Sequence, residues 1–326
     1  MNSSPTRRSP LKRHATTRYP LSAIDAGQRI VQVVGSLRFA TATQLRRAIF
    51  DRGSASPRQA RYRATKSLRR LFDSGYLRRV QVFCPSAASD RLSLQVVNVL
   101  SATGARAIGL DPWLARTRAP KPRSVLSHDF WLVELGVLAF EGCPAGLAIT
   151  HWWNDRVLAA RKRKGQLSLP TIPDALLVAR NLANGKEYPC LIELDLGTES
   201  VTSHDGTRGD FSRKIAGYVA YPETRFRQEF AIDAPPIVLI VADSDRRAAS
   251  LREATRRLGG GGRFWFAALP RLRGLDGPDT PNASPAALQG PFWGSNWLTA
   301  ADDHRRSLAA RCGLEGARAR SMAGTR

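Results

Sequence analysis

Apolar residues in the first third of the chain recur at helical spacing in three successive segments. The first segment runs from Ile24 to Leu37 and the second from Thr43 to Phe50. The third begins at Ser56-Pro57, where serine is a favoured N-cap and proline suits the first helical turn, and it continues to Ser74. The pattern predicts three helices.

Two β-prone segments follow the third predicted helix. They run from Tyr76 to Phe83 and from Leu92 to Leu100, and a turn-rich stretch from Pro85 to Asp90 joins them, which is typical of a hairpin. Three helices followed by a hairpin is the order of a winged helix-turn-helix domain, which we assign to residues 22–112. In such a domain the third helix enters the major groove of DNA.

The third predicted helix has two different faces. One face is apolar and can pack on the first two helices, and it carries Ala64, Leu68, Leu71 and Phe72. Another stripe carries Arg63, Lys66 and Arg70. The helix therefore separates a core side from a cationic side.

The charge of the chain is concentrated near this helix. The formal net charge is +23, and residues 1–80 contain 18 Lys or Arg against three Asp, so this segment alone carries +15. A solvated surface normally mixes both signs, whereas residues 54–67 carry cations and no acid. Such charge favours phosphate neutralisation, so we expect double-stranded DNA as the partner. The predicted DNA contacts are Arg58, Arg61, Arg63, Lys66 and Arg70.

Composition argues against a membrane or a secreted protein. The longest apolar run, around Pro236 to Ala242, is far shorter than the ~20 residues of a membrane helix. Residues 1–21 are basic and lack an apolar core, which predicts a disordered arm and no secretory signal. The four cysteines are scattered without a C-x-x-C pair, which indicates reduced thiols in a cytoplasmic protein.

A second domain is expected after a linker at residues 113–126, which contains Pro120-Lys-Pro122. Residues 127–270 alternate helices and strands, which predicts a mixed α+β or α/β sheet with helices on both faces. From residue 271 to 326 Pro, Gly, Ala and Ser dominate, so we expect a partly disordered tail that Trp293 and Trp297 dock locally.

Three carboxylates are expected to converge in this second domain. Asn184-Gly185 favours a two-residue hairpin turn, which would set Asp174 opposite Asp195 and bring Glu193 to the same face. Like charges repel, so either a divalent cation or a cationic side chain should neutralise the group, and oxygen ligands select Mg²⁺ or Mn²⁺. Lys214 on the next predicted helix is a candidate cation, although most lysines are simply solvated.

The spacing of these acids is similar to a known pattern. Pro173-Asp174, followed nineteen residues later by Glu193-Leu-Asp195, resembles the motif of the PD-(D/E)XK nuclease superfamily, in a matching order of helix, three strands, helix and strand. Glu134 matches an acid that some members carry on the first helix. Asp195 departs from the motif, which has Lys there, so Lys214 is a migrated substitute or the site is degenerate.

The whole chain resembles the replication-relaxation family of plasmid and mobile-element proteins over roughly residues 22–270. The resemblance rests on the segments 100–104, 127–129, 173–175, 193–199 and 214–218. It implies a DNA-binding protein that acts in plasmid replication or mobilisation.

Two activities remain open for the second domain. An active site would hold Mg²⁺ through Asp174 and Glu193, with Glu134 or Asp195, and Lys214 would position or deprotonate water to nick DNA. The other reading is a binding module that keeps only the fold, and Glu-x-Asp in place of Glu-x-Lys favours it. A transcriptional regulator is a further alternative. A relaxase would need a Tyr nucleophile near a His cluster, which His128, His151 and His204 do not form.

One more basic segment is notable. Arg161 to Lys164 is four consecutive cations near the expected carboxylate site, and we interpret it as a loop that contacts phosphate or is simply solvated.

Overall fold

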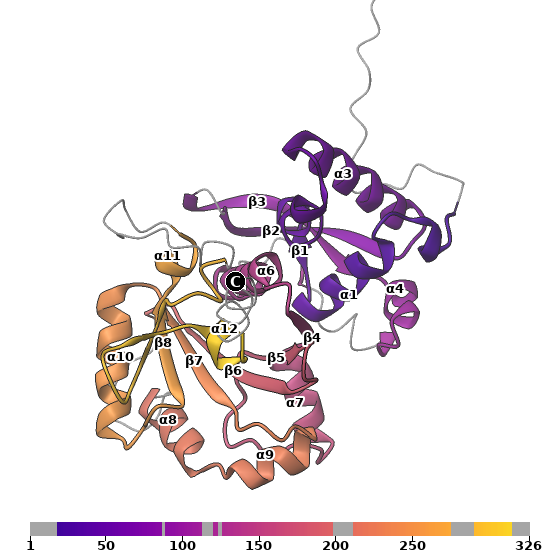
Figure 1. Ribbon diagram of the computed structural model, residues 1–326. Coiled ribbons are helices and arrows are strands. Elements are labelled where there is room, and N and C mark those ends of the chain that lie inside the picture. The colour runs from indigo at the N-terminus through magenta and orange to yellow at the C-terminus, as the bar shows by residue number, and fades with distance from the viewer. Residues whose placement is uncertain are drawn as a thin grey trace, which may run out of the picture. The chain divides into compact units, whose positions relative to one another are not determined.

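The structure is a computed structural model that describes residues 18–86, 89–112, 120–122, 126–197, 211–274 and 290–314. It divides into two compact units, Met1–Val137 and Leu138–Arg326, which we treat separately (Figure 1). Helix α6 (Ser127–Gly142) crosses the boundary between them. The expected arm, residues 1–17, and most of the expected linker lie outside the described residues.

The N-terminal unit contains three helices followed by an antiparallel hairpin, as predicted. The helices are α1 (Gly27–Leu37), α2 (Ala42–Ile49) and α3 (Pro57–Asp73). Strands β2 (Leu77–Ser86) and β3 (Ser89–Leu100) form the hairpin, and the short strand β1 (Ala40–Thr41) pairs with β3. Helix α4 (Ala102–Ala107) and the 3-10 turns Leu21–Ala23 and Asp51–Gly53 complete the unit.

Local sequence explains where these helices begin and end. Thr41 and Gln44 form a capping box at the start of α2, and Ser56 accepts a hydrogen bond from the backbone N–H of Gln59 at 3.2 Å at the start of α3. Gly75, with a φ of +85°, follows α3 in the left-handed region that glycine adopts without strain. Helix α1 starts at Gly27, three residues later than predicted, because Ile24 lies in a turn instead.

The apolar face predicted for α3 lies in the core of this unit. Its four residues, Ala64, Leu68, Leu71 and Phe72, are all buried. Helix α3 contacts α2 and strand β2, where Leu45 and Val82 are also buried. The periodicity of the sequence thus sets which side of α3 faces outward.

The second unit is built on a seven-stranded mixed sheet in the order β10-β9-β8-β7-β6-β5-β4. Strands β4 (Leu147–Asn154), β5 (Ala175–Asn181) and β6 (Glu187–Asp195) are antiparallel neighbours. Strands β7 (Ile237–Ala242) and β8 (Phe264–Ala268) continue the sheet parallel to β6. The short strands β9 (Trp297–Thr299) and β10 (Arg305–Arg306) extend it beyond β8.

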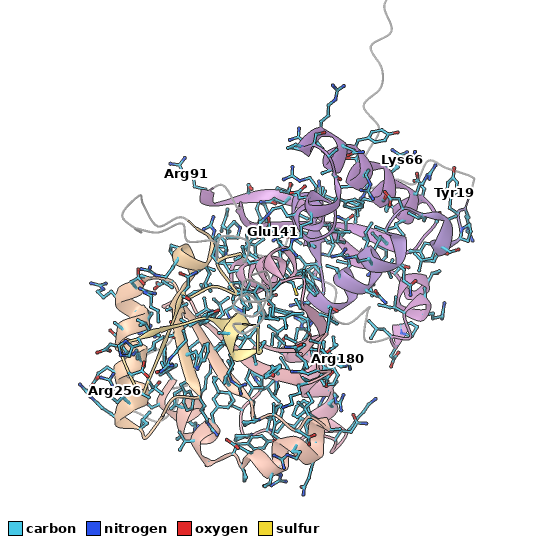
Figure 2. The ribbon with its side chains drawn as sticks, in the orientation of Figure 1. Tyr19, Lys66, Arg91, Glu141, Arg180 and Arg256 are labelled. Carbon is cyan, nitrogen blue, oxygen red and sulfur yellow. The ribbon has the colours of Figure 1, made fainter. Side chains whose placement is uncertain are left out.

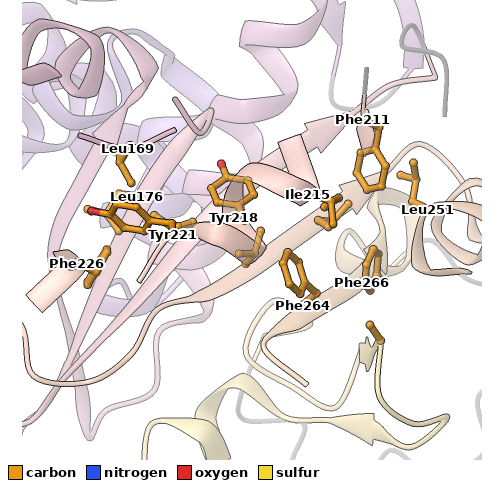
Figure 3. Packing of buried hydrophobic residues seen from close by; sticks show 14 of the residues in the cluster. Leu169, Leu176, Phe211, Ile215, Tyr218, Tyr221, Phe226, Leu251, Phe264 and Phe266 are labelled. Atoms are coloured by element: carbon orange, nitrogen blue, oxygen red, sulfur yellow. The ribbon is translucent and has the colours of Figure 1, made fainter. Parts of the chain in front are cut away.

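Helices cover this sheet, and the fold is therefore mixed α+β, as predicted. They are α7 (Asp155–Arg163), α8 (Phe211–Ala220), α9 (Glu223–Phe230), α10 (Asp245–Arg257), α11 (Leu269–Leu272) and α12 (Leu308–Arg311). On one face the core brings Ile215 and Tyr218 of α8 together with Phe264 and Phe266 of β8 (Figure 3).

The segment from residue 290 to 314 packs against α6 and β5. Trp293 and Trp297 are fully buried, and the indole N–H of Trp293 donates to the carbonyl of Ala139 at 2.8 Å. The amide of Asn181 on β5 donates to the carbonyl of Cys312 at 2.8 Å. The predicted docking of the two tryptophans is confirmed, and the segment also supplies two strands.

The predicted hairpin register between β5 and β6 is wrong by two residues. Ala175 pairs with Ile192 and Arg180 pairs with Glu187. Gly185 has a φ of +71°, whereas Asn184 is not among the positive-φ residues, so the two strands are joined by five residues, 182–186, and not by a two-residue type I′ turn. A shift of two residues keeps every side chain on its predicted face.

Among the described residues, no helix combines the length and the apolar character needed to cross a bilayer.

Candidate nucleic-acid interface and carboxylate site

The outward face of α3 carries exposed cations and one aromatic ring. Arg58, Arg61 and Lys66 are exposed, and so is Tyr62, with 63% of its surface accessible. The ammonium group of Lys66 lies 5.6 Å from the centre of the Tyr62 ring. Asp73 is the only acid of the helix, and it is buried and paired with Arg69 at 2.7 Å. The exposed face is therefore positively charged, and the helix itself has no exposed acid.

Two of the five predicted DNA contacts have partners inside the unit. The Arg63 guanidinium pairs with Asp25 at 2.8 Å and donates to the carbonyl of Gly53 at 2.9 Å. This hydrogen-bonded pair lowers the pKa of Asp25 below its usual value. Arg70 lies 4.7 Å from the centre of the Tyr19 ring. The stripe of three cations expected from periodicity is thus divided, and Lys66 is its exposed member.

The hairpin adds further exposed side chains. Arg78 and Arg91 are exposed, and Figure 2 labels Arg91 on the hairpin and Lys66 on α3. Phe83 pairs with Leu94 across the strands, and both are exposed, as is Leu92. Arg79 instead lies over the Phe72 ring at 4.5 Å, and burial lowers its pKa.

In the second unit, Glu193 is the centre of a buried polar group near the end of β6. Only 5% of its surface is exposed. The Tyr218 hydroxyl donates to its Oε1 at 2.5 Å, and the Lys214 ammonium lies 3.3 Å from its Oε2. Lys214 and Tyr218 are four residues apart on α8, so they project from the same side of the helix toward the sheet.

Asp174 lies beside Glu193, immediately before β5. Because Ala175 pairs with Ile192, the next position of the ladder sets Asp174 opposite Glu193 on the same face. The backbone N–H of Leu194 donates to Asp174 Oδ2 at 2.8 Å. Burial, and next the charge of Asp174, raise the pKa of Glu193 to about 8. Without further positive charge, Glu193 thus holds its proton at neutral pH.

Asp195 has a different partner. Its carboxylate receives two hydrogen bonds from the Arg247 guanidinium, at 3.0 and 2.8 Å, and a third from the backbone N–H of Gly197 at 2.8 Å. Arg247 lies in the first turns of α10, whose N-cap is Ser244. Asp195 therefore lies on the same face of the sheet as Glu193, but the bidentate hydrogen bonds from Arg247 neutralise it separately.

Glu134 belongs to the N-terminal unit, where it contacts α2. Its Oε2 accepts from the Gln44 amide at 2.9 Å, and its Oε1 forms an ion pair with Arg47. Only 2% of its surface is exposed. Both carboxylate oxygens are thus engaged by helix α2.

Of the carboxylates at this site, only Asp174 and Glu193 are neighbours that could bind a divalent cation together. Over the described ranges, no group of three His, Cys, Asp or Glu side chains is arranged to hold a metal ion. Asp174 and Glu193 remain as neighbouring oxygen donors, and burial followed by the charge of Asp174 accounts for the raised pKa of Glu193. Any Mg²⁺ or Mn²⁺ would therefore be held by Asp174 and Glu193.

Sequence reasoning missed three side chains at these sites. Tyr62 belongs to the exposed face of α3. A helical wheel places it away from the buried stripe, so its exposure could have been predicted from the sequence. Tyr218 follows Lys214 by one helical turn, which places both near the same acid. Arg247 lies 52 residues from Asp195 and on another element, and no local pattern in the sequence joins them.

These features define the class of the protein: two units, one a basic three-helix unit with a hairpin, the other a mixed sheet with a buried acid pair. The family profile for replication-relaxation matches residues 31–231, and the chain belongs to the replication-relaxation family. The family gives it a replication-related role. The match includes α3, Asp174, Glu193 and Lys214 and ends before Arg247. No curated protein and no solved structure matches the chain.

Proposed function

We propose that the protein binds double-stranded DNA of a plasmid or other mobile element, in the cytoplasm, and acts in its replication or mobilisation. In this proposal the N-terminal unit is a winged helix-turn-helix domain and α3 enters the major groove. The observation that carries it is the outward face of α3, on which Arg58, Arg61 and Lys66 are exposed and which has no exposed acid of its own.

The physical basis is phosphate neutralisation. Each cation that meets a phosphate releases a condensed counterion, so binding should weaken steeply as salt rises. The hairpin, with exposed Arg78 and Arg91, would follow the sugar–phosphate backbone as the wing. Arg63 is left out of the main contact set because Asp25 already holds its side chain, whereas Arg70, which lies over the Tyr19 ring, remains a further candidate contact.

The test is the salt dependence of binding by the full chain to a 30-bp DNA duplex, measured by fluorescence anisotropy. The triple variant Arg58→Ala/Arg61→Ala/Lys66→Ala should lower the slope of log K against log salt by about 3 units. Arg106→Ala removes an exposed arginine on α4 and is the matched control, for which we expect a wild-type slope. A triple variant that binds like the wild type would contradict the proposal.

We further propose that the second unit has a PD-(D/E)XK-like core that serves as a scaffold. The order α6, β4, β5, β6, α8, β7 follows the helix, three strands, helix and strand of that superfamily, with α7 and α9 as additions. Asp195 occupies the position at which the motif has lysine. Its carboxylate is bound by Arg247, and this ion pair joins β6 to α10. A structural role for Asp195 favours a domain that binds DNA over one that cleaves it.

A second candidate function is metal-dependent nicking of DNA. The observation in its favour is that Asp174, Glu193 and Lys214 lie together. Mg²⁺ held by the two carboxylates would supply an activated water and stabilise charge on the phosphate. Lys214 would hold the attacking water or the phosphate oxygens, and Tyr218 would orient Glu193 through its hydrogen bond.

One experiment separates the two candidates. Supercoiled plasmid is incubated with the full chain and Mg²⁺ or Mn²⁺, beside an EDTA control and the near-isosteric variants Asp174→Asn and Glu193→Gln. The scaffold proposal expects no nicked product from any sample. Nicking by the wild type that both variants and EDTA abolish would establish the nickase and overturn the scaffold.

A further inference from the structure

A second strongly basic surface lies in the second unit, on helix α7. Residues 156–173 contain five Lys or Arg and no Asp or Glu. Arg161 to Arg163, which we expected in a loop, form the last turn of α7, and Lys164 is its C-cap. Helix α7 packs on β4 and lies near β5 in Figure 1. The cations are thus held on a regular element and not on an irregular loop.

Arg161 is held in place, and among the described residues no carboxylate forms an ion pair with it. Its guanidinium lies 4.4 Å from the centre of the Trp153 ring, and its Nε is buried without a hydrogen-bond partner in the part of the chain that the structure describes. The buried Nε is out of reach of an external anion, so a phosphate would meet the outer nitrogens of this guanidinium. Stacking on an aromatic ring also reduces the entropy lost when the guanidinium binds.

The neighbours of Arg161 extend the positive surface. Arg163 and Lys164 are exposed, and Lys164 is one helical turn from Arg161. Lys162 has a structural contact, because its ammonium donates to the carbonyl of Leu169 at 2.5 Å. This contact secures the chain that leads from α7 toward Asp174.

The other end of α7 adjoins the carboxylate site. The backbone N–H of Asp155, the first residue of α7, donates to the carbonyl of Asp174 at 2.9 Å. At 1.5 Å of rise per residue, Arg161 lies about 10 Å along the helix from that end. A polyanion on the basic surface would therefore lie close to the acid pair without entering it.

We infer that Arg161, Arg163 and Lys164 form a second DNA-binding surface, which holds the phosphate backbone independently of α3. The inference rests on the proposed function in one respect, that the partner is DNA. The arrangement fits a backbone contact because exposed cations neutralise phosphates whatever the base sequence, and residues 156–173 contain no acid.

The test uses the full chain and a 60-bp DNA duplex, with the salt slope of binding as the readout. Arg163→Ala/Lys164→Ala alters exposed residues only and should lower the slope by about 2 units, and Arg161→Gln should lower it by about 1 unit. Combining the double variant with the α3 triple variant should lower the slope by the sum of the two effects. Unchanged thermal melting confirms that each variant is folded.

The matched control is Arg256→Ala/Arg257→Ala on α10, two arginines of the same unit that pair with Glu253. Equal slopes for the α7 variant and this control overturn the inference, because the effect would then be one of net charge. If the wild type fails to bind DNA, the proposed function fails first. If the α3 variant weakens binding while the α7 variants match the wild type, only this second surface is rejected.

Discussion

Helix α3 and the end of strand β6 use charge in opposite ways. On α3, Arg58, Arg61 and Lys66 are exposed, and the helix itself has no exposed acid. At the end of β6, each carboxylate has a cation within contact distance, Lys214 for Glu193 and Arg247 for Asp195. Lysine and arginine are therefore available to bind an external polyanion in one region, whereas in the other they neutralise carboxylates of the protein itself.

The difference shows why charge counts alone do not assign function. Exposed cations cost little to maintain in water and remain available for phosphates, whereas a buried carboxylate must have a partner for the fold to be stable. Arg63 illustrates the boundary: it lies in the basic sequence of α3, but Asp25 engages it. Burial and partner decide the role of each charge.

The largest effect is expected for Arg247→Met. It leaves the buried carboxylate of Asp195 without its cation, so the free energy of unfolding should fall by about 3 to 5 kcal/mol, measured by urea denaturation. The double variant Asp195→Leu/Arg247→Met removes the stranded charge and should recover most of this loss. A single variant as stable as the wild type would show that Asp195 is not neutralised by Arg247.

Glu193→Gln should change how stability depends on pH. The pKa of Glu193 is raised from 4.5 to about 8, so the folded state binds a proton that the unfolded state releases between these values. The metal-free wild type should therefore lose stability as pH rises from 5 to 8, by up to roughly 4 kcal/mol. The variant should lose much less over the same range, as followed by thermal melting.

The control for this pH experiment is Glu229→Gln. Ser168, Tyr221 and Arg225 hold the pKa of Glu229 below its usual value, so this variant should keep the wild-type loss between pH 5 and 8. Identical pH profiles for the wild type and Glu193→Gln would contradict the raised pKa. The outward face of α3 and the end of β6 would then differ less in how they use charge than their geometry indicates.

The smallest effect is expected for Arg63→Ala compared with Lys66→Ala. Lys66→Ala should lower the salt slope of DNA binding by about 1 unit, whereas Arg63→Ala should leave the slope unchanged. Loss of the Arg63–Asp25 pair should reduce stability by less than about 1 kcal/mol, because the pair is partly exposed. Equal slopes for the two variants would show that α3 binds with the stripe expected from periodicity.

Local sequence chemistry predicted the N-terminal unit closely. The helices, the cap at Ser56 and the hairpin follow from spacing and turn residues that act over a few positions. The order of elements around the large sheet was also readable, although α7 was interpreted as a basic loop and β9 as part of a tail. Strands as short as β9 carry too few residues to show an alternating pattern.

The carboxylate site was readable only in part. The predicted hairpin placed Asp174 and Glu193 on one face of the sheet. The observed register differs by two residues, and a shift of two residues keeps both side chains on that face. The partners of Asp195 and Glu134 were not predicted, since Arg247 and Arg47 are brought there by tertiary packing. Which acids share a cation depends on distances that sequence spacing does not encode.

The pairing of β9 with β8 has a consequence for synthesis on the ribosome. Trp265 and Phe266 on β8 meet Thr299 and Leu298, which emerge from the ribosome later than every strand from β4 to β8. Until then, β8 presents an unpaired apolar edge, a known template for aggregation. A chain interrupted before Trp297 would keep that edge open, so incomplete translation products should be preferred substrates for chaperones and proteases.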